Sequence, residues 1–356
     1  MKKIVHIDLN AFFIQVESLL NPELNKVPAV VAYNSNRSVI STSNYIARKY
    51  GVTSGQPLGI AKSICPSLVV VNPKYHLYVD YSKKFMNYLS SKTKLIEVGS
   101  IDEAYLDLTS YLIDNKEKEM LFDMQMEIYR KLNLKCSIGY SYTRFFAKMA
   151  SDYKKPLGLT IITQDNYSKI LYPLSINKVY GLGKKTCQYL EEYGIKTIED
   201  LVNLKDKKII SYFGSRYNDL ISCLTGHSSD IVSNEKYVAK SISTERTFSI
   251  DEEDFEIISK MFDSCSSELE KQLKKKNELA YGVTIKVRTN DFKTYTKKML
   301  LNKPISSSQL IYIYSLDLFE ELKINLPIRL IGIKLDKLIN NNDILENTDE
   351  ENILFK

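Results

Sequence analysis

Acidic residues at the ends of apolar, strand-like segments are the feature that most restricts how this chain can fold. The first such segment, KKIVHIDL, carries Asp8, and EVGSIDEAYLDLT carries Asp102 and Glu103 beside alternating apolar residues. A carboxylate on the apolar side of a strand is costly to bury unless a cation or several donors meet it. Each acid alone could cap a helix or shape a turn. Three acids at neighbouring strand ends would repel one another, and a pair of divalent cations resolves that conflict.

Oxygen ligands in this number favour Mg²⁺, which keeps some waters and takes its remaining ligands from substrate phosphates. Two such ions close together can activate an attacking oxygen and stabilise a leaving one during phosphoryl transfer. The pattern therefore predicts a phosphoryl-transfer site. Nucleotidyl cyclases and several nucleases also place acids at sheet ends, so the spacing alone leaves the enzyme class open.

The composition is that of a folded protein with several domains. The chain has 356 residues, of which 44% are apolar and 26% charged, so we expect two to four domains. No apolar run is long enough to cross a bilayer and no secretory signal precedes the first strand, so we expect a cytoplasmic protein that does not enter membranes. The five cysteines form no CxxC pair, which indicates reduced thiols rather than a disulfide or zinc framework.

The charge is spread unevenly along the chain. The net charge is +6, but residues 341–356 carry −4, which leaves about +10 on the rest. A basic body with an acidic tail fits a nucleic-acid partner, although solubility alone would also account for it.

Strand-like and helical segments mix over the first 164 residues and predict an α+β sheet with helices on one face. Residues 165–230 are predicted to be almost wholly helical, and residues 231–240 lack periodicity, as a linker would. Strands return at residues 241–340, where two helices are expected, at about 254–275 and 307–322. This last part predicts a second, smaller α+β domain.

Four ordered motifs carry a family resemblance. They are HIDLNAFFIQVE (6–17), ISTSNYIARKYGV (40–52), GSIDEAYLDL (99–108) and FAKMASDYKKPLG (146–158). Together they resemble the Y-family DNA polymerases, particularly the bacterial DNA polymerase IV group. The likeness continues through KVYGLGKKT (178–186) and KSISTERTF (240–248), so it extends over essentially the whole chain.

The resemblance implies a multidomain right-hand polymerase of the α+β class. Its expected parts are a ferredoxin-like palm (1–10 and 75–164), small fingers (11–74), a helical thumb (165–230), a linker (231–240), a C-terminal α+β little finger (241–340) and an acidic tail (341–356).

The activity that the resemblance implies is DNA-templated DNA synthesis of the translesion type, with low fidelity and no proofreading. The primer 3′-hydroxyl would attack the α-phosphorus of a deoxynucleoside triphosphate, and pyrophosphate would leave. Two Mg²⁺ ions would be held by Asp8, Asp102, Glu103 and the backbone carbonyl of Leu9. The rival interpretations are a catalytically inactive DNA-binding scaffold and a nucleotidyl cyclase.

The resemblance also assigns residues to the incoming nucleotide. Tyr45, Arg48 and Lys155 would bind the triphosphate, and Phe12 would lie near it. Phe13 matches a steric gate, a ring that would clash with a ribose 2′-hydroxyl. Without the resemblance, Tyr45 and Arg48 would be interpreted as an exposed helix face, and Phe13 as ordinary helix packing.

DNA contacts are expected in two places. The loop GLGKKT resembles a helix-hairpin-helix, in which Gly181 and Gly183 let the backbone approach a phosphate beside Lys184 and Lys185. In the little finger, the segment between residues 271 and 303 contains ten basic residues and only two acidic ones. The resemblance assigns this domain to the DNA groove, where Lys286 and Arg288 would follow phosphates. The alternative for the little finger is a solvated, charged surface.

Two further expectations concern the tail and the departures from the family pattern. Ile353, Leu354 and Phe355 resemble a peptide that docks in the sliding clamp, although tail packing or disorder would also explain them. Ser38 stands where the group commonly has Gly, at a position expected to line the nascent base pair, which bears on lesion preference. Tyr140 and Thr143 replace the more usual Ile and Asn, and none of the three departures affects a metal ligand. We expect a monomer.

Overall fold

The computed structural model describes residues 1–35, 37–235 and 238–342. The chain forms two compact units, residues 1–235 and residues 236–356, and each is considered by itself. In the described residues no helix is long and apolar enough to cross a membrane. Ile353, Leu354 and Phe355 lie outside the described residues.

A five-stranded sheet organises the first unit, with the order β5-β6-β1-β7-β8. Its strands are β1 (Ile4–Leu9), β5 (Ile96–Val98), β6 (Glu103–Asp107), β7 (Cys136–Ser141) and β8 (Leu159–Ile161). The central strand β1 pairs antiparallel with both β6 and β7, whereas β8 runs parallel to β7. The sequence of β1 is apolar and largely β-branched, and the strand is buried along its whole length, as its central position requires.

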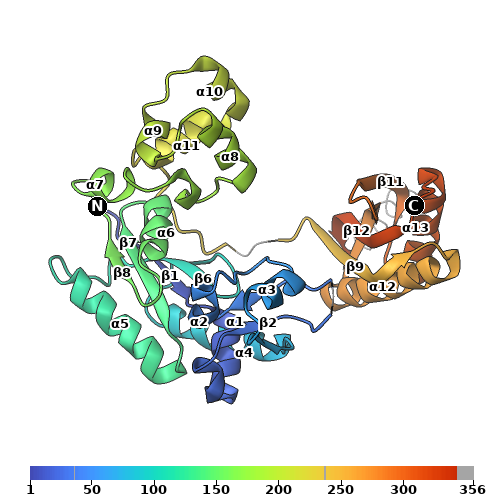
Figure 1. Cartoon of the computed structure of the whole chain (residues 1–356), viewed down its shortest axis with the longest axis horizontal. Coiled ribbons are helices and arrows are strands. Elements are labelled where there is room, and N and C mark those ends of the chain that lie inside the picture. The colour runs from blue at the N-terminus through green and yellow to red at the C-terminus, as the bar shows by residue number, and fades with distance from the viewer. Residues whose placement is uncertain (36, 236–237, 343–356) are drawn as a thin grey trace, which may run out of the picture. The chain divides into compact units, whose positions relative to one another are not determined.

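Helices cover both faces of this sheet, so the expectation of helices on one face is wrong (Figure 1). Val5 and Ile7 point to a core that they share with three helices, and the alternate residues of β1 point to the other side, where His6 contacts Ser151 of a fourth helix. The four are α1 (Phe12–Leu20), α4 (Tyr75–Ser90) and α5 (Glu117–Leu132) on the first face and α6 (Arg144–Tyr153) on the second.

Gly139 of β7 makes the second covered face possible. A Cβ atom there would lie 2.1 Å from the carbonyl oxygen of Ala147 and 2.3 Å from the backbone nitrogen of Ser151. The backbone of α6 therefore sits directly on the strand, which only glycine permits. The interpretation from sequence missed this layer because α6 is amphipathic whichever face it covers.

A smaller sheet and several helices complete the first unit. The sheet has the order β3-β2-β4, and a separate helical cluster buries Leu171, Leu190 and Leu201 among others. The remaining elements are η1 (Pro22–Asn25), β2 (Ala29–Val31), β3 (Thr42–Ser43), α2 (Tyr45–Lys49), α3 (Leu58–Ile64), β4 (Val69–Val71), α7 (Tyr167–Leu171), η2 (Ile176–Lys178), α8 (Lys184–Glu192), α9 (Ile198–Val202), α10 (Lys207–Phe213) and α11 (Arg216–Leu224).

The second unit is a four-stranded antiparallel sheet, of order β11-β10-β12-β9, with two helices packed on one face. Its elements are β9 (Ser241–Glu252), α12 (Phe255–Lys276), β10 (Glu278–Thr289), β11 (Thr294–Ile305), α13 (Ser308–Leu322) and β12 (Ile328–Asn340). The helices expected near 254–275 and 307–322 are confirmed. Val283, Ile285 and Val287 alternate into the core with Phe262 of α12, as the period of a strand with one covered face requires.

Phe262→Ala should destabilise the second unit by about 3–5 kcal/mol, because it leaves a cavity in a close-packed core. Phe262 is 0% exposed, whereas Ile257 on the same helix is 43% exposed. Ile257→Ala is therefore the matched control and should change the free energy of unfolding by less than about 0.5 kcal/mol. Urea unfolding of both variants checks the expectation, and equal losses would contradict the assigned core.

Candidate active site

Strand pairing brings the three predicted acids to one end of the central sheet. Asp8 lies opposite Glu103 in the β1–β6 register. The backbone N–H of Leu9 donates to the carbonyl oxygen of Asp102 at 2.9 Å. Residues almost a hundred positions apart are therefore neighbours because of backbone hydrogen bonds that do not depend on the acids themselves.

Most of the predicted metal and nucleotide residues line one cavity of about 210 Å³. Its walls come from the end of β1, the start of α1, the α2 region and the segment after α6. The predicted residues in its lining are Asp8, Leu9, Phe12, Tyr45, Arg48, Asp102 and Lys155, and Ala11, Ser41, Thr42 and Ser54 complete it. Glu103 and Phe13 are the two predicted residues that do not line it.

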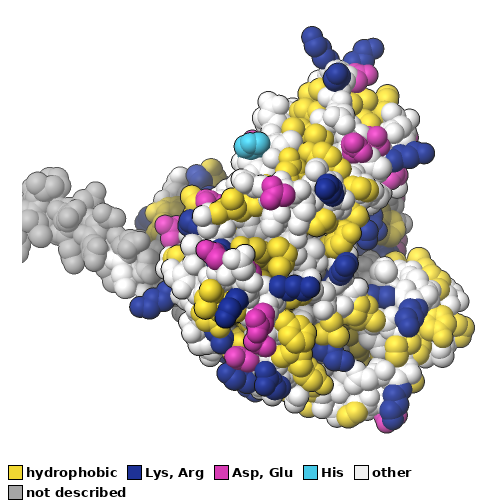
Figure 2. Space-filling view, turned by 90° about the vertical axis from the view of Figure 1, so that its left-hand side faces the viewer, with side chains coloured by type: hydrophobic (Ala, Val, Ile, Leu, Met, Phe, Trp, Pro, Cys, Tyr) yellow, Lys and Arg dark blue, Asp and Glu magenta, His cyan; other side chains and the backbone are white. Residues whose placement is uncertain are grey.

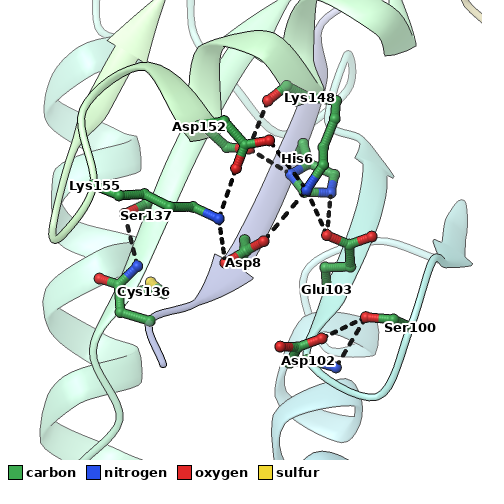
Figure 3. Close-up of polar contacts among 12 residues, drawn as sticks. His6, Asp8, Ser100, Asp102, Glu103, Cys136, Ser137, Lys148, Asp152 and Lys155 are labelled. Carbon is green, nitrogen blue, oxygen red and sulfur yellow. Dashed lines mark hydrogen bonds and ion pairs between the residues drawn. The ribbon is translucent and has the colours of Figure 1, made fainter. Parts of the chain in front are cut away.

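Asp8 is buried between two lysine side chains (Figure 3). Its carboxylate oxygens lie 2.7 Å from Lys155 Nζ and 3.3 Å from Lys148 Nζ. Burial raises the pKa of Asp8 to about 6, although attraction to Lys155 and Lys148 opposes the shift. The carboxylate is thus costly to ionise and depends on nearby cations.

Glu103 points away from the cavity, toward α6. Its Oε2 accepts a hydrogen bond from Lys148 Nζ at 2.6 Å and lies 3.5 Å from His6 Nε2. Burial opposes ionisation, but the nearby His6 and the hydrogen bond from Lys148 hold the pKa of Glu103 well below its usual range. Lys148 also lies 3.4 Å from Asp152, and although burial lowers its pKa, the surrounding acids raise it overall.

Asp102 has a different environment from the other two acids. It lies in the bend before β6, where Ser100 Oγ donates to its Oδ1 at 2.5 Å. It is half-buried, and it faces the same cavity as Asp8.

The donor chemistry fits a divalent cation. Within the described ranges, no three acidic, histidine or cysteine side chains are already grouped to hold a metal ion. Lys148 Nζ lies between Asp8 and Glu103 and neutralises both carboxylates, as a bound cation would. Asp8, Leu9 and Asp102 line the same cavity, so the two carboxylates border one space in which hard oxygen donors could hold a cation.

The predicted triphosphate residues Tyr45 and Arg48 are held by α2. Asn44 caps this helix, with its side chain accepting from the backbone N–H of Ala47 at 2.8 Å. The Arg48 guanidinium lies 4.5 Å from the Tyr45 ring centroid, and its Nε donates to the Ser43 carbonyl at 3.1 Å. The buried Tyr45 hydroxyl has no hydrogen-bond partner among the described residues, so it is free to donate to a ligand.

The Phe13 ring packs against α4 and is not part of the cavity lining. Its ring stacks on Tyr78, with centroids 4.4 Å apart and planes 12° apart. The Tyr78 hydroxyl donates to the buried Glu17 carboxylate at 2.8 Å, and Lys74 binds the same carboxylate at 2.7 Å. The ring is therefore fixed by a hydrogen-bonded support.

The predicted DNA-binding residues lie in both units. Gly181 has a φ of 84°, and Gly183 caps α8 without a side-chain hydrogen bond, next to the exposed Lys184 and Lys185. In the second unit, Lys286 Nζ binds both oxygens of Glu245, and Arg288 Nε donates to Thr294 Oγ1 at 2.9 Å. On the face drawn in Figure 2, Lys and Arg side chains are scattered rather than gathered in one patch.

Three residues that the interpretation from sequence missed complete the polar network: His6, Lys148 and Asp152 (Figure 3). A signal for two of them was present, because Lys148, Asp152 and Lys155 are spaced i, i+4 and i+7 in FAKMASDYKK and so share one side of a helix and its extension. His6 gave no signal, since a histidine in a strand is usually a core residue.

Comparisons with known proteins agree with this geometry. The impB/mucB/samB family matches residues 7–152, and the C-terminal domain of that family matches residues 239–347. DNA polymerase IV of Ureaplasma parvum serovar 3 is 35% identical over 99% of this chain and 98% of its own length. DNA polymerase IV of Staphylococcus saprophyticus is 36% identical over 95% of each chain. The chain belongs to the Y-family DNA polymerases.

Solved structures confirm the family and the fold class. The Y-family DNA polymerase chimera Dbh-Dpo4(243-245)-Dbh matches 95% of this chain and 100% of its own with a TM-score of 0.85 and 29% identity. DinB from Sulfolobus solfataricus matches the same shares with a TM-score of 0.63 and 28% identity. The expected α+β, multidomain polymerase fold is confirmed, and so is the enzyme class of DNA-directed DNA polymerase.

Lys155→Met should raise the pKa of Asp8 above its value of about 6, because Lys155 favours the ionised carboxylate by attraction and a hydrogen bond. Lys154→Met changes an exposed neighbour and serves as the control. NMR titration of the Asp8 carboxyl carbon in metal-free protein measures the shift. An unchanged or lower pKa in Lys155→Met would contradict the assigned electrostatics.

Proposed function

We propose that the cavity at the end of β1 is the site at which this family member adds deoxynucleotides to a primer during translesion DNA synthesis. The observation that carries the proposal is the arrangement of Asp8 and Asp102 in one cavity with Tyr45, Arg48 and Lys155. Acidic oxygens on one side and phosphate-binding groups on the other suit a nucleoside triphosphate with its metal ions.

Asp8, Asp102 and the backbone carbonyl of Leu9 would hold two Mg²⁺ ions, with Glu103 as a further ligand once its carboxylate leaves Lys148. When bound, such ions activate the attacking hydroxyl and stabilise the leaving pyrophosphate. The raised pKa of Asp8 supports this role, since a buried carboxylate gains most from a nearby cation.

The other cavity residues would bind and orient the triphosphate. Arg48 offers a planar fork for two phosphate oxygens, Lys155 a mobile charge, and Tyr45 a hydroxyl whose hydrogen-bonding capacity is unused in the described structure. Phe12 lies in the same lining. Phe13 would exclude a ribose 2′-hydroxyl, a role that suits a ring supported by Tyr78.

Primer-template DNA would be held by two surfaces. The Gly181–Gly183 loop before α8 presents backbone N–H groups and two exposed lysines, which suits phosphate contacts without sequence readout. The sheet of the second unit carries Lys286 and Arg288. A similar structure is an insertion ternary complex of Dbh DNA polymerase, with a TM-score of 0.64.

The remaining expectations stay predictions of this proposal. Palm, fingers, thumb, linker and little finger keep the boundaries given from the sequence. A clamp-docking peptide at residues 353–355 is retained, as are a monomeric state and a cytoplasmic location.

Asp102→Ala should lower template-directed primer extension by at least about a hundredfold, because it removes a ligand of the metal ions. DNA binding, measured by fluorescence anisotropy, should be unchanged. Asp123→Ala, at an exposed position of α5, is the control. Full extension by Asp102→Ala would refute the assigned site, whereas a cyclic product formed without template would favour a nucleotidyl cyclase.

Phe13→Ala should raise incorporation of ribonucleotides relative to deoxynucleotides by about tenfold or more, since the 2′-hydroxyl would no longer meet the ring. Single-nucleotide insertion kinetics with both sugars measures the ratio. An unchanged ratio would show that Phe13 is a packing residue.

A further inference from the structure

Among the described residues 238–342, no helix covers one face of the sheet of the second unit. Side chains on each strand alternate between the helix-covered core and this open face, so residues two positions apart share a face. The charged residues of the open face are Glu245 on β9, Lys286 and Arg288 on β10, Lys298 on β11, and Lys334 and Asp336 on β12. Both acids are engaged by lysines.

Glu245 reaches across an entire strand to Lys286. In the sheet register, Glu245 lies opposite Gly332, and Gly332 lies opposite Lys286, so the three residues form one row across β9, β12 and β10. Lys286 Nζ lies 2.8 and 2.9 Å from the two oxygens of Glu245. The Glu245 carboxylate thus lies over β12, on the open face.

Asp336 on β12 makes the same kind of contact across the neighbouring strand β10. It lies opposite Gly282 of β10, and its two oxygens lie 2.7 and 2.8 Å from Nζ of Lys298 on β11, the strand beyond. Each acid therefore crosses a glycine to bind a lysine two strands away.

The glycines are needed for this crossing. A Cβ atom on Gly332 would lie 2.6 Å from Cγ of Glu245, and one on Gly282 would lie 2.0 Å from Oδ1 of Asp336. Neither glycine has a positive φ, so backbone conformation does not require glycine at either position. What both positions share is a neighbouring acid that occupies the space of the missing side chain.

We propose that Glu245 and Asp336 compete with DNA phosphates for Lys286 and Lys298, and so limit the affinity of the polymerase for its primer-template. The proposal rests on the proposed function, which assigns Lys286 and Arg288 to the DNA backbone, and it extends that assignment to Lys298 on the same face. Each carboxylate is paired with the lysine ammonium group that a phosphate oxygen would bind. After a phosphate has displaced it from the lysine, the nearby carboxylate would still repel that phosphate.

Exchange is feasible because the lysine of each pair is partly exposed to solvent. Side-chain exposure is 33% for Lys286 and 42% for Glu245, and 41% for Lys298 and 15% for Asp336. An exposed pair such as Lys286–Glu245 contributes little net stability, so we expect phosphate to displace Glu245 more readily than the more buried Asp336. The affinity of the face is therefore set by a balance of opposite charges rather than by the number of lysines. A polymerase with such a balance would release DNA after short synthesis.

The test uses Glu245→Gln and Asp336→Asn in the full chain, which keep the side-chain size and remove the charge. Each should tighten binding to a primer-template duplex about three- to tenfold at 0.15 M salt, and lengthen the products made per binding event. The matched control is Glu321→Gln, which removes an acid paired with Lys297 on the helix-covered side of the same sheet. The control should leave binding unchanged.

Lysine variants separate this proposal from the proposed function. Lys286→Ala and Lys298→Ala should weaken binding and reduce the dependence of affinity on salt. If they weaken binding while neither acid variant tightens it, the competition is refuted and the DNA-binding face stands. If they leave binding unchanged, the face does not bind DNA and both proposals for it fail.

Gly332→Ala gives a second, independent route to the same result. The added methyl should displace Glu245 from Lys286 without removing its charge, so binding should tighten less than in Glu245→Gln. Thermal unfolding shows whether the variant is folded. A folded Gly332→Ala that binds as the unaltered chain does would contradict the crossing geometry.

Discussion

The position of one buried carboxylate, Asp8, determines much of the organisation around the candidate active site. Burial disfavours its charge, and it retains that charge through Lys155 and Lys148. These lysines come from α6 and the segment that follows it, so α6 must lie directly over the sheet. Gly139 permits that approach. Strand pairing, helix packing and electrostatics therefore depend on one another here, and none of them alone would place the acids.

The two units use their lysines in related ways. Lys148 neutralises Asp8 and Glu103 in the first unit, and Lys286 neutralises Glu245 in the second. In both places a lysine is paired with a carboxylate to which we assign a role. Asp8 and Glu103 are proposed metal ligands, and Glu245 is proposed to compete with DNA for Lys286. Because of this internal pairing, neither carboxylate nor lysine is left as an unpaired charge before a metal ion or DNA binds.

Much of this was predictable from the sequence, and the failures have physical causes. Alternating apolar residues and strand-end acids identified β1 and β6, and the motif order identified the family. The second layer over the sheet was missed because Gly139 reveals a close approach only once its neighbour is known. Glu103 stays a predicted metal ligand, but its orientation toward His6 and Lys148 could not be predicted, because pairing between distant side chains leaves no local pattern in the sequence.

If Phe13 excludes a ribose 2′-hydroxyl as we propose, the residues that support its ring affect how this selection could change. Tyr78 and Glu17 lie behind the ring, and Lys74 neutralises Glu17. A substitution in α4 that replaces Tyr78 by a smaller side chain would let the Phe13 ring shift toward α4. No residue proposed to contact a nucleotide would itself be altered. Under the proposed function, substitutions in a packing helix would then change the discrimination between the two sugars, and the residues proposed to hold the metal ions would stay unaltered.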